Sequence, residues 1–395
     1  MNDKGSALAL KDRPLRVAHL VAISGRGGRG ATALRMVRKL NERGHRVVLC
    51  CRSGGVPEEA GRKMGIRVEA EYSFARGFHP TRTYSDVVRL RKLIEDEKLE
   101  ILHAHTPEDS WVAALAARPM RPRLKIVRSR GIVVPIRDHG PNRWLHNQMT
   151  DRLVVPCQRI REIVGLSPGL DLEKVVVIYD GVDAERFRPD RAGRGAAFRR
   201  EIGVPEGAPL IGMIARVEPI KGHVFFLEAA ARVLAARPDA RFVVCCDERT
   251  PGAVQAIMAC ARGLGLSESS VIFTGFVEDV EKVYSALDVY ALPSLGSEGS
   301  SRGTLEAMAS AVPVVATNVG SIPELLDGGK TGRMVPPRNS DALAAAILDI
   351  LRSPDEAAEM GRRARERVLS HFTEDIMASN IERLYREVIA EGAAP

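Results

Sequence analysis

The chain has 395 residues, 45% of them hydrophobic, which is enough for two packed domains of ordinary size. No apolar run approaches the roughly 18 residues needed to span a bilayer, and residues 1–12 lack the apolar core of a signal peptide. The six cysteines form no C-x-x-C pair, so we interpret them as small core residues in a reducing compartment. These features exclude secreted disulfide scaffolds and membrane spans, and they predict a cytoplasmic globular protein.

Charge is unevenly distributed along the chain, whose formal net charge is +8. Residues 1–179 contain 33 Lys and Arg against 19 Asp and Glu, whereas the remainder contains 25 against 31. The basic half indicates an anionic partner such as the inner face of a membrane, or alternatively only a solvated basic surface. Aromatic residues make up 5% of the chain and do not alternate with basic ones, so nucleic acid is not expected as a partner.

Short apolar runs alternate with helical or loop segments in both halves of the chain, which predicts two mostly parallel sheets with helices on both faces. The expected strands lie at 16–23, 45–51, 66–71, 99–105, 124–129, 151–156 and 174–179, and then at 210–215, 240–246, 270–276, 289–294, 312–317 and 332–337. Each half is therefore predicted to be a doubly wound α/β domain, with a ligand cleft between the two where the carboxyl ends of the strands face one another.

The expected domain boundaries follow from composition. We assign residues 1–185 to the first domain and residues 210–375 to the second, joined by a linker at 186–209 that is rich in Pro, Gly and Arg. Two helical segments end the chain, and the last of them, at 376–395, is expected to cross back and pack on the first domain.

The stretch "SGRGGRG" at residues 24–30 has the Gly-x-Gly-x-x-Gly spacing of a dinucleotide-binding turn. It follows an expected strand and opens an amphipathic helix that Gly44 closes. An NAD site also needs a carboxylate at the end of the second strand, but that strand ends in Cys50, Cys51 and Arg52. An NADP-dependent dehydrogenase stays as a remote alternative, because Arg52 could meet a 2′-phosphate. The motif itself predicts only a backbone that approaches a phosphate.

The second half carries the more specific groups. Arg216 follows a strand and Lys221 comes five residues later, where a helix begins, so the two cations form a site suited to a diphosphate. A turn of small residues after the strand at 289–294 opens a helix, with Glu298 before the turn and Glu306 inside the helix. A carboxylate in that position can accept two hydrogen bonds from a vicinal diol.

Together with "GSIPELL" and "VVVIYDGVDAERFRP", these motifs resemble glycosyltransferase family 4, whose members are retaining enzymes of GT-B fold. The resemblance covers nearly the whole chain. It implies a transferase that moves a sugar from a nucleotide-sugar donor to a glycan or lipid-linked acceptor in cell-envelope polysaccharide or lipopolysaccharide synthesis. It also implies that the second domain holds the donor. The composition and the basic first half add the expectation of a cytoplasmic protein that is peripheral on the inner membrane face.

Residue roles carried over from the family are expectations of the resemblance. Glu298, Arg216 and Lys221 would be catalytic, the two cations holding the diphosphate and Glu298 contacting the transferred sugar. The donor site would further include Gly27, Gly28, Ser300, Ser301, Arg302 and Glu306, the last binding the ribose. An oxygen of the departing phosphate would serve as the base that takes the proton of the acceptor hydroxyl. The chain lacks a D-x-D stretch, so neither a metal nor another cofactor is expected.

Two positions are possible acceptor-side residues. Many relatives have a His-Gly pair near the reacting carbon after the fifth strand, where this chain has Arg130 and Gly131. A catalytically silent binding subunit therefore stays as an alternative. His105 ends the fourth strand, and we expect it to point into the cleft while His103 points to the opposite face. His19 is expected to be structural or exposed.

Overall fold

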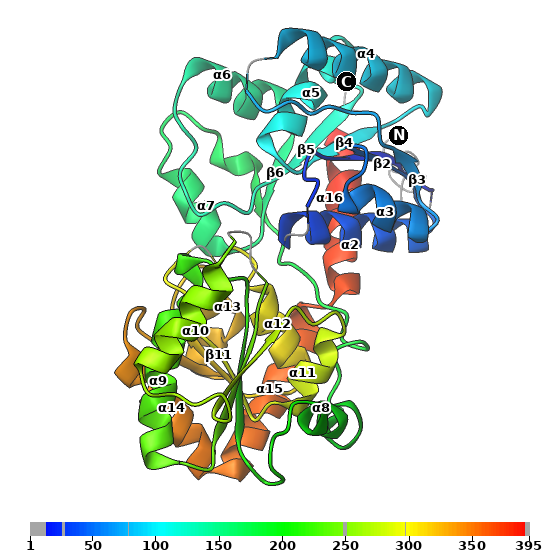
Figure 1. Cartoon of the computed structure of the whole chain (residues 1–395). Helices are drawn as coiled ribbons and strands as arrows, with labels where there is room; N and C mark the ends of the chain where they lie inside the picture. The colour runs from blue at the N-terminus through cyan, green and yellow to red at the C-terminus, as the bar shows by residue number, and fades with distance from the viewer. Residues whose placement is uncertain (1–12, 26–27, 78, 248–250, 297, 392–395) are drawn as a thin grey trace. The chain divides into compact units, whose positions relative to one another are not determined.

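The computed structural model describes residues 13–25, 28–77, 79–247, 251–296 and 298–391. It consists of two compact units, one formed by Met1–Gly181 with Glu374–Pro395 and the other by Val182–Thr373 (Figure 1). Each unit is built on its own parallel sheet, so the prediction of two doubly wound α/β domains is confirmed.

The first unit contains a seven-stranded sheet in the order β3-β2-β1-β4-β5-β6-β7, with every neighbouring pair parallel. Its strands are β1 (Arg16–Val21), β2 (Arg46–Cys51), β3 (Arg67–Glu69), β4 (Ile101–Ala104), β5 (Lys125–Ser129), β6 (Arg152–Val155) and β7 (Val175–Val177). Its helices are α2 (Gly28–Glu42), α3 (Val56–Lys63), α4 (Pro80–Asp96), α5 (Pro107–Ala117), α6 (Gly140–Arg143), α7 (Gln158–Gly165) and α16 (Glu374–Glu391).

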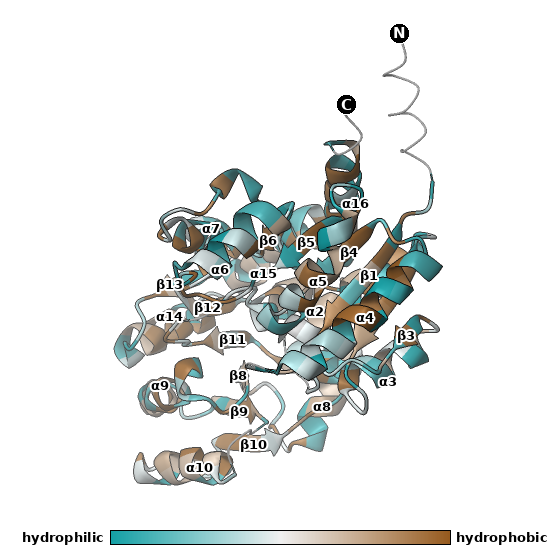
Figure 2. Ribbon diagram, turned by 90° about the horizontal axis from the view of Figure 1, so that it is seen from above, coloured by the Kyte–Doolittle hydropathy of each residue, from teal (hydrophilic) through white to brown (hydrophobic). Residues whose placement is uncertain are grey.

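Strands of the first sheet are buried on both faces, as the continuous apolar runs of the sequence predict for parallel strands. In Figure 2 the hydrophobic colour is concentrated on strands such as β1 and β4. One face packs against α4 and α5, and the other packs against α2 and α16. The C-terminal helix thus returns to the first unit, as predicted, and buries Ile381, Leu384 and Tyr385 there.

The second unit contains a six-stranded parallel sheet in the order β10-β9-β8-β11-β12-β13. Its strands are β8 (Leu210–Ile214), β9 (Arg241–Cys245), β10 (Val271–Gly275), β11 (Val289–Leu292), β12 (Val314–Thr317) and β13 (Arg333–Val335). Its helices are α8 (Ala196–Glu201), α9 (His223–Ala236), α10 (Ala253–Gly263), α11 (Val280–Ala286), α12 (Arg302–Ala309), α13 (Ile322–Leu325), α14 (Ser340–Arg352) and α15 (Pro354–His371).

The segment 186–209, predicted to be a linker, is instead folded as part of the second unit. Phe198 on α8 is 1% exposed, and Arg199 Nε donates to the Ala286 carbonyl at 2.9 Å. Gly195 fits because a Cβ there would stand 2.3 Å from the Ser285 carbonyl oxygen. The arginines and glycines of this segment suggested a loop in the sequence. In the structure they hold the segment against α11, the arginines by hydrogen bonds and Gly195 by allowing close backbone contact.

Candidate functional site

The predicted donor-side residues follow two neighbouring strands of the second sheet. Arg216 and Lys221 come after β8, whereas Glu298 and Glu306 come after β11. Strand order runs outward in opposite directions from this β8–β11 pair, which makes it the topological switch point of the sheet. Ligands of doubly wound sheets bind at the carboxyl ends of the strands at such a point.

Lys221 and Glu298 form a direct ion pair there, with 2.6 Å between Nζ and Oε1. Ser294 Oγ donates to the same carboxylate oxygen at 2.5 Å, and Glu298 is only 5% exposed. Gly222 makes the contact possible. It adopts a φ of 76°, and a Cβ at this position would stand 2.0 Å from the Pro293 carbonyl oxygen. Only glycine lets the turn after β8 approach the end of β11 this closely.

Glu298 is also fixed through its backbone. The Ser321 N–H donates to the Glu298 carbonyl at 2.8 Å. Gly320, with a φ of 58°, leaves room for that carbonyl, since a Cβ would come within 2.1 Å of it. Thr317 Oγ1 donates to the Ser294 carbonyl at 2.5 Å, so the end of β12 supports the same loop. The carboxylate beside Lys221 is therefore rigidly placed.

Helix α12 begins at Arg302, after Ser301 in the left-handed region at a φ of 38°. That conformation costs a non-glycine residue of order 1–3 kcal/mol and is typical of functional loops. The Ser301 and Thr304 hydroxyls lie 2.9 Å apart, and Ser300 beside them is half-buried. The turn thus presents the first N–H groups of α12 at the switch point, where an anion or hydroxyl could accept from them.

Glu306 lies one turn into α12 and is 6% exposed. Arg302 Nε donates to Oε1 at 2.6 Å, and Tyr284 Oη donates to Oε2 at 3.0 Å. Burial, and next the Glu306 charge, raise the pKa of Tyr284 well above its usual range, so the phenol remains a donor. Both carboxylate oxygens are engaged, yet each keeps capacity for a further hydrogen bond.

Arg216 is half-buried and stands 3.0 Å from Glu218, measured from Nη1 to Oε1. The structure thus brings Lys221 to Glu298 and Arg302 to Glu306, while Arg216 pairs with Glu218, which was not among the predicted site residues.

His223 is a residue that sequence reasoning missed. It is the first residue of α9, two positions after Lys221, and is 5% exposed. Its Nε2 has no hydrogen-bond partner among the residues that the structure describes. Burial lowers the pKa of His223 to about 4, so the ring is neutral at pH 7. The signal that could have found it was its position at the start of the helix that follows the two cations.

The predicted residues of the first domain lie in the first unit. Gly28 begins α2, and Gly27 falls outside the described residues. Arg130 directly follows β5 and donates from Nη2 to the Val134 carbonyl at 2.5 Å. His105 follows β4 and is 4% exposed, and burial lowers its pKa to about 3.

The expectation that His103 and His105 point to opposite faces is wrong. Residues two apart on a strand share a face, and their ring centroids stack at 4.4 Å. His19 is fully buried against His105, with 3.0 Å between Nδ1 and Nε2. One nitrogen of each of these three histidines lies within 4.8 Å of the others, a spacing at which residues of this type could hold a metal ion.

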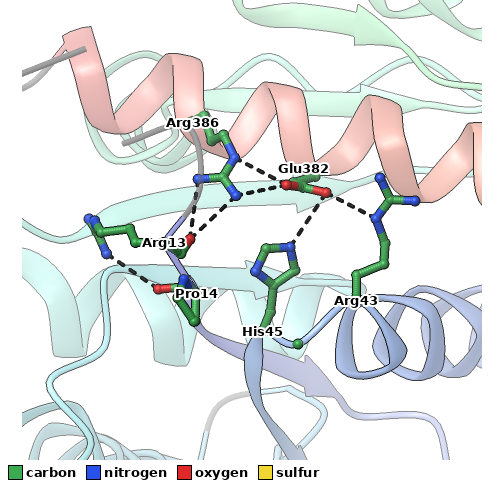
Figure 3. Close-up of a pocket in the computed structure, with 7 residues that line it drawn as sticks. Arg13, Pro14, Arg43, His45, Glu382 and Arg386 are labelled. Carbon is green, nitrogen blue, oxygen red and sulfur yellow. Dashed lines mark hydrogen bonds and ion pairs between the residues drawn. The ribbon is translucent and has the colours of Figure 1, made fainter. Parts of the chain in front are cut away.

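A cavity of about 420 Å³ lies beside the amino ends of strands β1 and β2 in the first sheet (Figure 3). Its central group is Glu382 of α16, which accepts from Arg386 at 2.7 Å and from Arg43 at 3.0 Å. His45 Nε2 stands 3.5 Å from the same carboxylate. Burial opposes ionisation, but these partners outweigh it and lower the pKa of Glu382 to about 2. The cluster anchors α16, at the edge of the sheet opposite to the carboxyl ends.

Two family models match the chain. The one described as Glycosyltransferase Family 4 covers residues 26–186, and the one described as Glycosyl transferases group 1 covers residues 208–353. The chain is 30% identical over 254 residues to an alpha-maltose-1-phosphate synthase of Mycolicibacterium smegmatis, covering 62% of this chain and 65% of that protein. It is 31% identical over 225 residues to a D-inositol 3-phosphate glycosyltransferase of Segniliparus rotundus, covering 56% and 49%. The match thus spans half to two thirds of these relatives.

Solved structures agree on the fold. A glycosyltransferase from Rickettsia africae superposes with a TM-score of 0.85 at 20% identity, covering 95% of this chain and 99% of that one. Anabaena HepE in complex with UDP superposes with a TM-score of 0.82 at 20% identity, covering 94% and 100%. Two doubly wound units of this kind, superposable on these structures, define the GT-B fold class. The chain belongs to glycosyltransferase family 4.

Proposed function

We propose that the protein is a retaining glycosyltransferase whose second unit binds a nucleoside-diphosphate sugar. The observation that carries the proposal is the buried Lys221–Glu298 pair beside Glu306 at the β8–β11 switch point. A cation for the diphosphate and two carboxylates for hydroxyl groups stand together there, which is the chemistry that such a donor requires.

Lys221 and Arg216 would stabilise the leaving diphosphate, where negative charge grows in the transition state. Preorganised cations achieve this without solvent reorganisation. Without donor, Lys221 is neutralised by Glu298 and Arg216 by Glu218. Donor phosphates would therefore compete for both cations, and Glu298 would be released to accept from a sugar hydroxyl.

Glu306 would accept hydrogen bonds from the ribose diol. Its present partner Arg302 is 41% exposed and can turn toward solvent, whereas Tyr284 is buried and would keep holding the carboxylate. We infer that the Arg302 guanidinium occupies the position of the ribose before the donor binds. Once the donor has displaced it from Glu306, the guanidinium would either face solvent or contact the donor sugar.

Transfer with retention would use the departing phosphate oxygen as the base for the acceptor hydroxyl. HepE has been solved with UDP and with UDP-glucose, which makes UDP-glucose the first donor to test. The names of the two curated relatives both contain a sugar or inositol phosphate. A glycan or lipid-linked acceptor of cell-envelope polysaccharide or lipopolysaccharide synthesis, reached at an anionic membrane face, completes the proposal. No helix among the described residues has the length and apolar character to cross a bilayer.

Thermal unfolding against a panel of nucleotide sugars and NADP tests this function. A ligand at about 100 times its Kd adds roughly 2.7 kcal/mol to the stability of the folded protein. We expect one nucleotide sugar and its nucleoside diphosphate to raise the Tm, and Glu306→Ala to reduce the shift by half or more. A shift with NADP alone would contradict the proposal. Donor binding without turnover on any acceptor would instead favour the silent binding subunit.

A further inference from the structure

Five side chains of the first unit form one continuous chain of hydrogen bonds across β1, β4, β5 and α16. Ser129 Oγ lies 2.7 Å from His103 Nε2, and His103 Nδ1 lies 2.6 Å from Tyr385 Oη. Tyr385 Oη lies 3.2 Å from His19 Nε2, and His19 Nδ1 lies 3.0 Å from His105 Nε2. We call these five residues the relay chain.

Strand register explains why the groups meet. His19 on β1 is the direct partner of His103 on β4, and His105 lies two residues further on the same face. Helix α16 covers this face and places the Tyr385 hydroxyl between His19 and His103. Tyr385, His19 and His103 have no exposed surface, and His105 keeps 4%.

The geometry does not suit a metal ion, although the residue types do. Both nitrogens of His19 and both of His103 already lie within hydrogen-bond distance of a partner in the chain. The rings of His103 and His105 are stacked, with 16° between their planes. Ligating imidazoles must instead direct free lone pairs at one common point.

Proton counting shows that the relay chain has two equivalent states. A neutral imidazole has one N–H donor and one acceptor nitrogen, and a hydroxyl can donate one bond while accepting another. If His105 Nε2–H donates to His19, then His19 donates to Tyr385, Tyr385 to His103, and His103 to Ser129. If Ser129 donates to His103, all four bonds run the other way. All five groups are neutral, and all four hydrogen bonds are kept, in either state.

We propose that the relay chain carries a proton between Ser129 at the end of β5 and His105 at the end of β4. A proton that binds Ser129 Oγ displaces the Ser129 proton to His103 Nε2, and His103 passes its Nδ1 proton to Tyr385. Tyr385 passes its own proton to His19 Nε2, and His19 passes its Nδ1 proton to His105 Nε2. The His105 ring, which keeps 4% exposure, then releases the proton on its Nδ1 to solvent. One proton enters, one leaves, and all four bonds reverse.

Burial keeps the relay chain in its neutral form. It lowers the pKa of His105 to about 3 and the pKa values of His19 and His103 well below the usual range, with neighbouring imidazoles as the next cause for these two. Burial also raises the pKa of Tyr385 well above its usual range. Because a charged imidazole is unfavourable in such a place, the four transfers have to be concerted, and the relay chain is neutral before and after them.

The direction of proton transfer, from Ser129 to His105, rests on the proposed function. Sugar transfer gives the acceptor proton first to the departing phosphate oxygen, which can pass it on, and Ser129 directly precedes Arg130 on the segment expected to face the acceptor. Ser129 is half-buried, so it can meet a solvent or substrate proton. The relay chain would take that proton at the end of β5 and deliver it to the end of β4, at the same carboxyl edge of the sheet.

An NMR experiment tests the relay chain without any reference to activity. In protein with ¹⁵N-labelled histidine, both ring nitrogens of His19 and His103 should show averaged shifts, because each nitrogen is protonated in one state only. Tyr385→Phe removes the central hydroxyl and should fix each ring in one tautomer. The matched control is Tyr72→Phe, which removes another buried hydroxyl of the first unit, 3% exposed, and should leave the averaging unchanged. Fixed, fully distinct shifts in the unsubstituted protein would overturn the proposal.

Kinetics then separate this proposal from the proposed function. We expect Tyr385→Phe to lower kcat by about 100-fold, the lower range for a lost acid-base group, with the KM for donor unchanged. The solvent deuterium isotope effect on kcat should change as well. If Tyr385→Phe does not fold, Ser129→Ala interrupts the partly exposed end, and Ser129→Thr should restore turnover. Normal kcat and isotope effect in the interrupted variants would refute the relay while leaving the transferase assignment intact.

Discussion

Lys221 is the side chain on which the donor site depends most. It lies at the end of the turn before α9, where Gly222 brings it within 2.6 Å of Glu298. In the free protein it neutralises a carboxylate that is 5% exposed, and with donor bound it would neutralise phosphate.

Lys221→Ala should lower turnover about 100 to 1,000-fold, because one preorganised donor of this kind contributes roughly 2.7 to 4 kcal/mol to transition-state binding. Lys330→Ala is the matched control, since Lys330 also pairs with a carboxylate of the second unit but is 78% exposed. The test is to compare the steady-state turnover of the two variants with the donor that binds best. Comparable rates for both variants would mean that Lys221 does not face the leaving group.

Glu306→Ala should weaken nucleotide binding by about 1.5 to 3 kcal/mol, the range for hydrogen bonds to a charged group. Calorimetric titration with UDP, GDP and ADP measures it. Arg302→Ala provides the contrast, because it frees one oxygen of Glu306 and should leave binding equal or tighter. Unchanged affinity of Glu306→Ala for the preferred nucleotide would remove the ribose role.

For single residues, the sequence predicted which side chains lie in the donor site better than it predicted which partners they contact. Arg216, Lys221, Glu298 and Glu306 could be selected because charged groups after strand ends are informative in a doubly wound sheet. Their present partners could not be predicted. The Lys221–Glu298 pair spans 77 positions, and it depends on the φ of Gly222 and on a close backbone approach that no local pattern encodes.

The positions of strands and helices along the chain were the feature best predicted from the sequence. All expected strands are present, because continuous apolar runs between turns leave little choice but buried parallel strands. The segment 186–209 was misjudged for a physical reason. Its arginines hydrogen-bond to backbone carbonyls at the end of α11, so a polar composition hides a folded element.

Helix α16 also explains part of the charge asymmetry. Lys39 of α2 pairs with Asp375, and Arg43 pairs with Glu382. Arg38 donates to Glu374 as well. Some of the basic surplus of the first half is therefore complemented by the C-terminal helix of the same unit, which the sequence order alone conceals.

The histidines between β1, β4 and α16 should make the first unit sensitive to acid. Their folded pKa values lie below the usual 6.5, so the fold favours the neutral rings. This contribution is complete above about pH 6.5 and is lost as pH falls toward 3, by about 2 kcal/mol for His105 alone at pH 5.

Urea unfolding monitored by tryptophan fluorescence measures this loss, because both tryptophans, Trp111 and Trp144, lie in the first unit. Asp109, whose pKa burial raises to about 7, contributes the opposite slope. The difference between the unsubstituted protein and His105→Gln isolates the histidine. Equal slopes for the two proteins between pH 7 and 5 would contradict the assignment.

For the molecule as a whole, net charge makes one prediction. The full chain should bind vesicles that contain anionic phospholipid at low salt, and binding should weaken as ionic strength rises, because exposed charges are screened beyond about 10 Å at 0.1 M salt. Sedimentation of the vesicles measures the bound fraction. Absence of binding at low salt would leave the basic residues as a solvated surface that partly complements α16.

The central claim is that the second unit holds a nucleotide-sugar donor for transfer with retention. Its most direct test needs no acceptor, because slow hydrolysis of the donor is followed by proton NMR of the released sugar. With the α-linked donor selected by thermal unfolding, we predict that the α anomer forms first and that Lys221→Ala abolishes the reaction. First formation of the β anomer, or hydrolysis by Lys221→Ala at the rate of the unsubstituted protein, would contradict the account.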